Sequence, residues 1–105
     1  MSPHLPTLQA FQPVTVELAA GQQIDYLIKP TETRKYRIET RGATDTLMLL
    51  FENFGDTPRY LSGDDDSSED RNASITYRLF YGRTYTVRLR VYNPGQSGRT
   101  SLIYS

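Results

Sequence analysis

The side chains best able to carry chemistry lie between residues 64 and 70, a stretch that reads DDDSSED and in which five of seven residues are acidic. Its alternate positions hold Asp64, Asp66, Ser68 and Asp70. Oxygen side chains spaced in this way on a curling loop can converge on calcium, which takes about six to eight oxygen ligands. The spacing therefore indicates a calcium site. An EF-hand is excluded, because Glu69 and Ile75 stand where its glycine and its bidentate glutamate belong.

A second interpretation of this acidic stretch needs no metal. Five like charges so close together repel one another unless a cation or an arginine neutralises them, and Arg71 follows directly. A solvated loop whose aspartates cap turns and keep a sheet edge soluble would have the same composition. Both interpretations stay open, and we expect any calcium site here to be weak.

Catalytic residues are scarce in this chain. It has no cysteine and a single histidine, His4, close to two prolines. Neither a Ser-His nor a Cys-His pair can therefore be assembled in an ordered site, and no glycine-rich phosphate loop is present. The clustered carboxylates are expected to repel one another rather than to form an acid and base pair at a fixed separation. The sequence predicts a protein without enzymatic activity.

Arginines supply the other candidate site. From Arg71 to the C-terminus there are six arginines and no acidic residue. A ligand-binding sheet face is predicted to carry Arg78, Arg88, Arg90 and Tyr92, with Arg99 as a further candidate. Such a face would accept an acidic protein or a polysaccharide, although a face kept soluble by charge is the alternative. Because 12 basic and 12 acidic side chains cancel, we do not expect nucleic-acid binding.

Short strands must position these side chains. Apolar and polar residues alternate along 13–18, 23–28, 35–39, 74–79, 85–91 and 99–104, with the two-residue period of half-buried strands. Residues 47–51 form a continuous apolar run, as expected of a strand covered on both faces, and 59–62 can return as a short strand. Gly82 is expected to take a positive φ in a hairpin that joins 74–79 to 85–91.

These strands, without a persuasive helix, predict an all-β domain of about eight strands, an antiparallel β-sandwich or a small barrel. Residues 14–105 would form the domain, and the proline-containing residues 1–13 an N-terminal arm or linker. No apolar run approaches the roughly 18 residues of a membrane span. Most tyrosines are expected to pack in the core. The predicted core comprises Val16, Ile24, Tyr26, Ile38, Leu47, Leu49, Ile75, Tyr77, Leu79, Tyr85, Val87 and Leu89.

The order of several short motifs resembles the bacterial pre-peptidase C-terminal domain, whose relatives include the collagen-binding modules of clostridial collagenases. These motifs are Tyr-x-Ile-x-Thr before a glycine, Asp-Thr before an apolar strand, the DDDS loop and Gly-x-Thr-Tyr-x-Val-x-Leu, and the resemblance covers about residues 14–104. It implies a jelly-roll-like sandwich. It also implies that Asp45 joins the DDDS aspartates as a calcium ligand, although LPTLQAFQP stands where calcium-binding relatives have an acidic segment.

The resemblance further implies an accessory role in a secreted or surface protein. We therefore expect a noncatalytic module, attached to a parent enzyme such as a peptidase or to a surface protein, that binds protein or polysaccharide and whose binding calcium modulates. The alternative is a structural module that mediates assembly through a sheet edge or a tyrosine-rich face.

Overall fold

The computed structural model describes residues 6–42, 46–54, 57–65, 73–91 and 95–105. Within these ranges all regular structure is β, with no helix. The eight strands are β1 (Val14–Leu18), β2 (Gln23–Ile28), β3 (Arg34–Arg41), β4 (Thr46–Phe54), β5 (Thr57–Asp65), β6 (Ser74–Leu79), β7 (Tyr85–Val91) and β8 (Gly98–Tyr104). Each overlaps a predicted strand, and β3, β4, β5 and β8 extend beyond the predicted limits.

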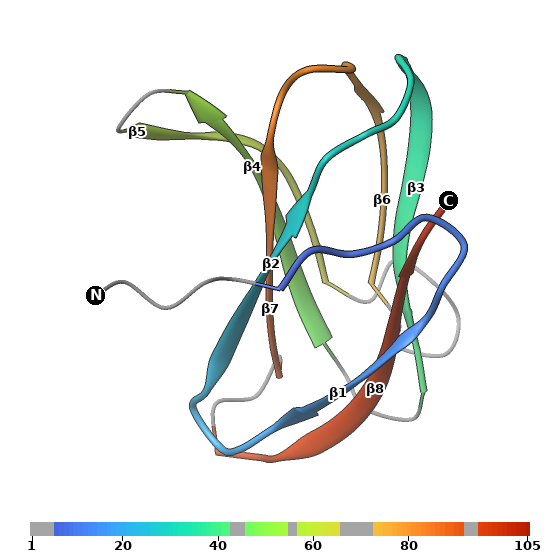
Figure 1. The fold of residues 1–105 in the computed structure, drawn as a ribbon. Helices are drawn as coiled ribbons and strands as arrows, with labels where there is room; N and C mark the ends of the chain where they lie inside the picture. Colours follow the sequence, from blue (N-terminus) through green and yellow to red (C-terminus); the bar gives the residue numbers. More distant parts are fainter. Residues whose placement is uncertain (1–5, 43–45, 55–56, 66–72, 92–94) are drawn as a thin grey trace.

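The strands form two four-stranded antiparallel sheets that face each other (Figure 1). One sheet has the order β1-β8-β3-β6 and is here called sheet B, and the other has the order β2-β7-β4-β5 and is here called sheet A. Consecutive strands lie in different sheets except for β4 and β5, and these two strand orders are those of a jelly roll. The predicted β-sandwich is confirmed.

The predicted hairpin between β6 and β7 is wrong. β6 pairs with β3 in sheet B, whereas β7 pairs with β2 and β4 in sheet A. The connection between them is a turn in which the Arg83 N–H donates to the Phe80 carbonyl and Gly82 takes the expected positive φ of 89°. Alternation shows which face of a strand is buried but not which strand lies beside it, because both sheets turn their apolar face to one core.

On β4 the prediction assigned the wrong residues to the core. Met48 and Leu50 are fully buried, whereas Leu47 and Leu49 are half-buried on the outer face of sheet A. A continuous apolar run lacks the alternation that would identify its inner face. The neighbouring strand β7 shows which face of β4 points inward. Leu50 lies opposite Val87 and Met48 opposite Leu89, and both β7 residues point into the core.

The remainder of the predicted core is confirmed. Val16, Ile38, Ile75, Leu79, Tyr85, Val87 and Leu89 are buried, while Ile24, Tyr26 and Tyr77 are half-buried and pack against the core. The expectation for tyrosine is confirmed as well, because Tyr36 and Tyr104 are also buried, with ring centroids 5.6 Å apart. These rings fill the space between the sheets.

The segment before β1 packs along the sandwich from Pro6 onward. The Leu8 N–H donates to the Leu27 carbonyl and the Leu27 N–H to the Pro6 carbonyl, so this segment extends sheet A at the β2 edge. The Phe11 N–H then donates to the carbonyl of Tyr104 in sheet B. Figure 1 shows the segment passing from β2 to β1, and the buried Leu8 side chain joins the core.

Candidate functional site

The outer face of sheet A carries a cluster of polar and aromatic side chains around Arg88. The members, here called the Arg88 cluster, are Asp25, Phe51, Asn53, Pro58, Thr86 and Arg88, and they line a cavity of about 190 Å³. This cavity is a small depression on one sheet face, lined by both polar and apolar side chains.

All four strands of sheet A contribute to the cluster. Asp25 on β2 lies opposite Arg88 on β7, Phe51 on β4 lies opposite Thr86, and Asn53 lies opposite Pro58 on β5. These residues point outward because their neighbours along each strand, such as Val87 and Leu50, point into the core. Strand pairing therefore brings together residues from distant parts of the chain.

Arg88 is held at the centre of the cluster by two kinds of contact. Its Nε and Nη2 donate to Oδ1 and Oδ2 of Asp25, at 3.1 and 3.3 Å. Its guanidinium carbon lies 5.1 Å from the centroid of the Phe51 ring, within the range of a cation–π contact. The Arg88 and Asp25 side chains are 36% and 22% exposed. A bidentate, partly buried pair of this kind fixes the orientation of both groups.

A second polar contact lies beside this ion pair. Thr86 Oγ1 donates to Asn53 Oδ1 at 3.0 Å, and the Thr86 residue is buried. Tyr60 on β5 packs edge-on against Phe51, with ring centroids 5.9 Å apart, and remains 58% exposed. Polar groups and aromatic rings thus lie side by side on this face. The arrangement is suited to binding, since it contains carboxylate, guanidinium, amide and hydroxyl groups but no activated nucleophile.

The structure separates the predicted arginines. Arg88 and Arg90 share the outer face of sheet A, whereas Arg78 is exposed on the outer face of sheet B. Arg99 is also on sheet B and pairs with Glu17. The prediction of one arginine-lined face is therefore wrong, because β6 and β7 belong to different sheets. Tyr92 lies outside the described residues.

The predicted calcium ligands fall almost entirely outside the described residues. Asp45, Asp66, Ser68 and Asp70 lie there. Asp64 belongs to β5, where its backbone pairs with that of Met48 in β4. In the part of the chain that the structure describes, no three histidine or carboxylate side chains are grouped to hold a metal ion.

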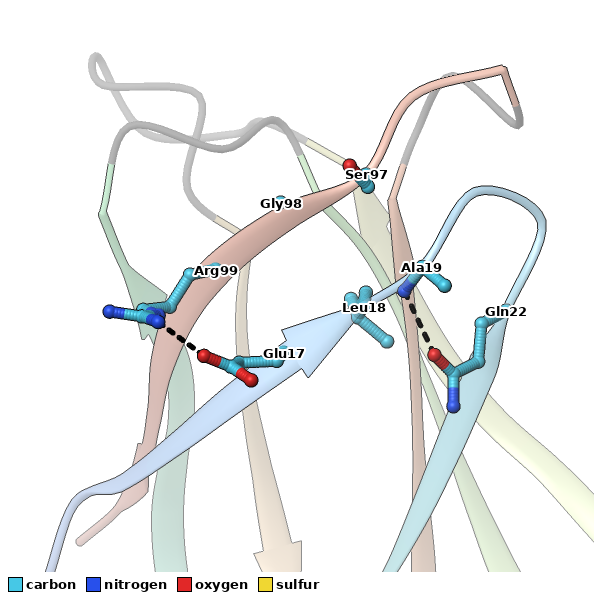
Figure 2. Close-up of a pocket in the computed structure, with 7 residues that line it drawn as sticks. All are labelled: Glu17, Leu18, Ala19, Gln22, Ser97, Gly98 and Arg99. Carbon is cyan, nitrogen blue, oxygen red and sulfur yellow. Dashed lines mark hydrogen bonds and ion pairs between the residues drawn. The ribbon is translucent and has the colours of Figure 1, made fainter.

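A larger and more open depression lies at one end of sheet B, where the β1–β2 turn approaches β8 (Figure 2). Its volume is about 690 Å³. Glu17 and Arg99 form an ion pair on its rim, with side chains 67% and 71% exposed. The Ala19 N–H donates to Gln22 Oε1 at 2.8 Å and closes the turn. Exposed ion pairs contribute little to binding or stability, so we regard the Arg88 cluster as the better candidate.

Comparison with solved structures identifies the fold. The pre-peptidase C-terminal domain of collagenase from Bacillus anthracis superposes with a TM-score of 0.77 at 9% identity, over 100% of this chain and 98% of that chain. The chain has the pre-peptidase C-terminal domain fold. The Yersinia pseudotuberculosis-derived mitogen shares this fold more distantly, with a TM-score of 0.64 at 12% identity, over 90% of this chain and 83% of the mitogen.

Sequence comparison alone does not reach this result. No protein-family model matches the chain, and no curated protein matches it by sequence. The likeness to solved structures shows the fold alone, so the role of the side chains on its outer faces is judged from their geometry in this chain.

No helix in the described ranges has the length and apolar character needed to cross a membrane.

Sequence reasoning named Arg88 but missed its partners. Asp25, Phe51 and Asn53 come from β2 and β4, whose pairing with β7 the predicted hairpin did not include. One signal was available. Asp25 is the acidic residue on the polar side of residues 23–28, and such a residue needs an opposite charge across the sheet once that strand is a neighbour of β7.

Proposed function

We infer that this chain is a noncatalytic accessory module of a secreted or surface protein, such as a peptidase, and that it binds protein or polysaccharide through the outer face of sheet A. The observation that carries the proposal is the Arg88 cluster. Its central arginine is held by Asp25 and Phe51 while its side chain stays 36% exposed, so the face presents a preorganised set of polar groups to a ligand.

Two further observations support a role in binding without catalysis. The chain has no cysteine and one histidine, which leaves the usual nucleophile and base pairs unavailable. The fold is shared with the pre-peptidase C-terminal domain of a collagenase. An accessory module concentrates its parent enzyme on an insoluble substrate, and for this it needs a binding face rather than an active site.

The test is cosedimentation of the isolated chain with insoluble collagen, cellulose, chitin and peptidoglycan, with the supernatant analysed for released fragments. We expect saturable binding to at least one polymer and no release of peptide or sugar. Amide hydrogen exchange of the bound chain should show protection on β7 and β4. Release of fragments that persists after repurification, or the absence of binding to all four polymers, contradicts the proposal.

Calcium modulation forms a separate part of the proposal. It rests on the spacing of Asp64, Asp66, Ser68 and Asp70 and on the place of Asp45 in the family resemblance. Calcium that binds only the folded chain would raise the melting temperature. Calorimetric titration at millimolar calcium, with Asp64→Asn/Asp66→Asn as the comparison, tests this. Heat and a rise in melting temperature that the double variant abolishes are expected, and their absence in the parent chain rejects it.

Assembly through a sheet edge is the second candidate function. Pro6–Leu8 cover the β2 edge through backbone hydrogen bonds, and β5 is the opposite edge of sheet A. A tyrosine-rich face is not formed by the described residues, where Tyr60 and Tyr81 are the exposed tyrosines. Sedimentation across a wide concentration range decides between the candidates, because edge pairing produces a concentration-dependent dimer and the binding module stays a monomer.

A further inference from the structure

We propose that the Arg88 cluster binds a neutral saccharide, with one sugar ring seated in the cavity. This inference rests on the proposed function and narrows its ligand from protein or polysaccharide to a neutral polysaccharide. It follows from the charge balance, the hydrogen-bonding groups, the apolar walls and the size of the cavity.

The charge balance disfavours an ionic ligand in the cavity. Arg88 and Asp25 neutralise each other through two parallel hydrogen bonds. An anion that approached Arg88 would meet the Asp25 carboxylate, and a cation that approached Asp25 would meet the guanidinium. Arg90 lies on the same face but does not line the cavity. A neutral ligand avoids both repulsions.

The hydrogen-bonding groups that remain suit hydroxyl groups. Arg88 Nη1 makes no hydrogen bond to any described residue and retains two N–H donors, while each Asp25 oxygen retains an unused lone pair. Neighbouring hydroxyls on a sugar ring can accept from the guanidinium and donate to the carboxylate. Likewise, the Asn53 amide nitrogen has no partner among the described residues, and Thr86 Oγ1 can still accept. The cavity therefore offers both donors and acceptors to a ligand.

The other walls of the cavity are apolar. Phe51 and Pro58 line it, and Tyr60, which is not a lining residue, packs in a T-shaped arrangement with Phe51. A sugar ring has a C–H face that packs on such surfaces while its hydroxyls turn to polar groups. Tyr60 is 58% exposed and would support the next sugar unit of a chain.

The size of the cavity limits the occupant. Its volume of about 190 Å³ lies below the roughly 300 Å³ at which pockets for drug-sized ligands begin. One sugar ring is a suitable occupant, whereas a folded peptide segment is too large. A polysaccharide would be held by a single unit in the cavity and by its neighbours along β5.

Two-dimensional amide NMR of the whole chain tests this inference. The probes are methyl glycosides of glucose, galactose, mannose and N-acetylglucosamine, with the methyl glycoside of glucuronic acid and sodium acetate as charged counterparts. We expect at least one neutral glycoside to shift the amide signals of Asp25, Asn53, Thr86 and Arg88. The charged probes should shift them less at equal concentration.

Variants locate the binding. Arg88→Gln and Asn53→Ala should each weaken the affinity for the neutral glycoside about tenfold, as expected when a ligand loses one or two well-placed hydrogen bonds. Arg99→Gln, which removes an arginine of sheet B, is the matched control and should leave the affinity unchanged. The melting temperature of each variant shows that the fold is retained.

Three outcomes overturn the inference. They are the absence of shifts with every neutral glycoside, tighter binding of a charged probe, and unchanged affinity in both cluster variants. If the chain nevertheless sediments with one of the insoluble polymers, the proposed function stands and the saccharide assignment alone fails. If it binds neither glycosides nor polymers, both fail.

Discussion

Asp25 and Arg88 lie directly opposite each other on β2 and β7, and both Asp25 carboxylate oxygens accept a hydrogen bond from the Arg88 guanidinium. This relationship joins two residues that are 63 positions apart in the chain. It differs from the cross-strand pair of Glu17 and Arg99 in sheet B, in which both side chains are more than half exposed.

The Asp25–Arg88 pair should contribute measurably to stability. A double-mutant cycle with Asp25→Asn and Arg88→Gln is expected to give a coupling free energy of up to about 1 kcal/mol in urea unfolding. The matched cycle with Glu17→Gln and Arg99→Gln should give a smaller value, because water screens an exposed pair more strongly. Equal coupling in the two cycles would contradict the partial burial of the Asp25–Arg88 pair.

The inner face of β4 can be tested by truncation. Leu50 is fully buried and Leu49 half-buried on the opposite face. We expect Leu50→Ala to lower the free energy of unfolding by about 2–5 kcal/mol, through lost burial and a residual cavity. Leu49→Ala should cost less. A larger loss for Leu49→Ala than for Leu50→Ala would indicate that the other face of β4 is inside.

A buried pair of threonines links the two sheets. Thr40 Oγ1 on β3 lies 2.9 Å from Thr46 Oγ1 on β4 and accepts from the Ala73 N–H at 2.9 Å. Thr40→Val should lower the free energy of unfolding by about 1–3 kcal/mol, because it leaves a buried N–H without its acceptor. Thr15→Val, at an exposed position of β1, is the control and should change it by no more than about 0.5 kcal/mol.

Alkaline pH should destabilise the fold through two tyrosines. Burial raises the pKa of Tyr26, and burial followed by the nearby Tyr36 raises the pKa of Tyr104, with Arg34 opposing the shift in Tyr104. A raised pKa in the folded state means that the contribution to stability is complete below the unfolded value of about 10 and is lost as pH rises through the folded value.

The free energy of unfolding should therefore fall as pH rises above about 10. Tyr26→Phe/Tyr104→Phe should show a shallower fall in chemical denaturation, because neither phenol remains to ionise. Tyr81→Phe removes an exposed phenol and is the control. A fall in the double variant as steep as that in the parent chain would assign the alkaline transition to other groups.

The sequence predicted the strands better than their partners. The bounds of β2, β6 and β7 agree with the alternation residue for residue, because the two-residue period is a local property. The neighbours of β7 could not be predicted in the same way. The five residues between Leu79 and Tyr85 can close a hairpin or cross between sheets, and both choices bury the same side chains.

The candidate site was predictable only in part for the same reason. Arg88 and Arg90 could be named from their outward positions in the alternation. Asp25 and Phe51 join Arg88 only because β2 and β4 flank β7. Arg78 was grouped with them through the predicted hairpin and lies on the other face of the molecule.

The comparison of Arg88→Gln with Arg78→Gln in the polymer cosedimentation assay tests the central claim most directly. Each variant removes one strand arginine, from the outer face of sheet A and of sheet B respectively. Binding through sheet A predicts that Arg88→Gln weakens binding to the polymer about tenfold, while Arg78→Gln binds as the parent chain does. Full binding by a folded Arg88→Gln variant, or loss of binding in Arg78→Gln alone, would contradict the account.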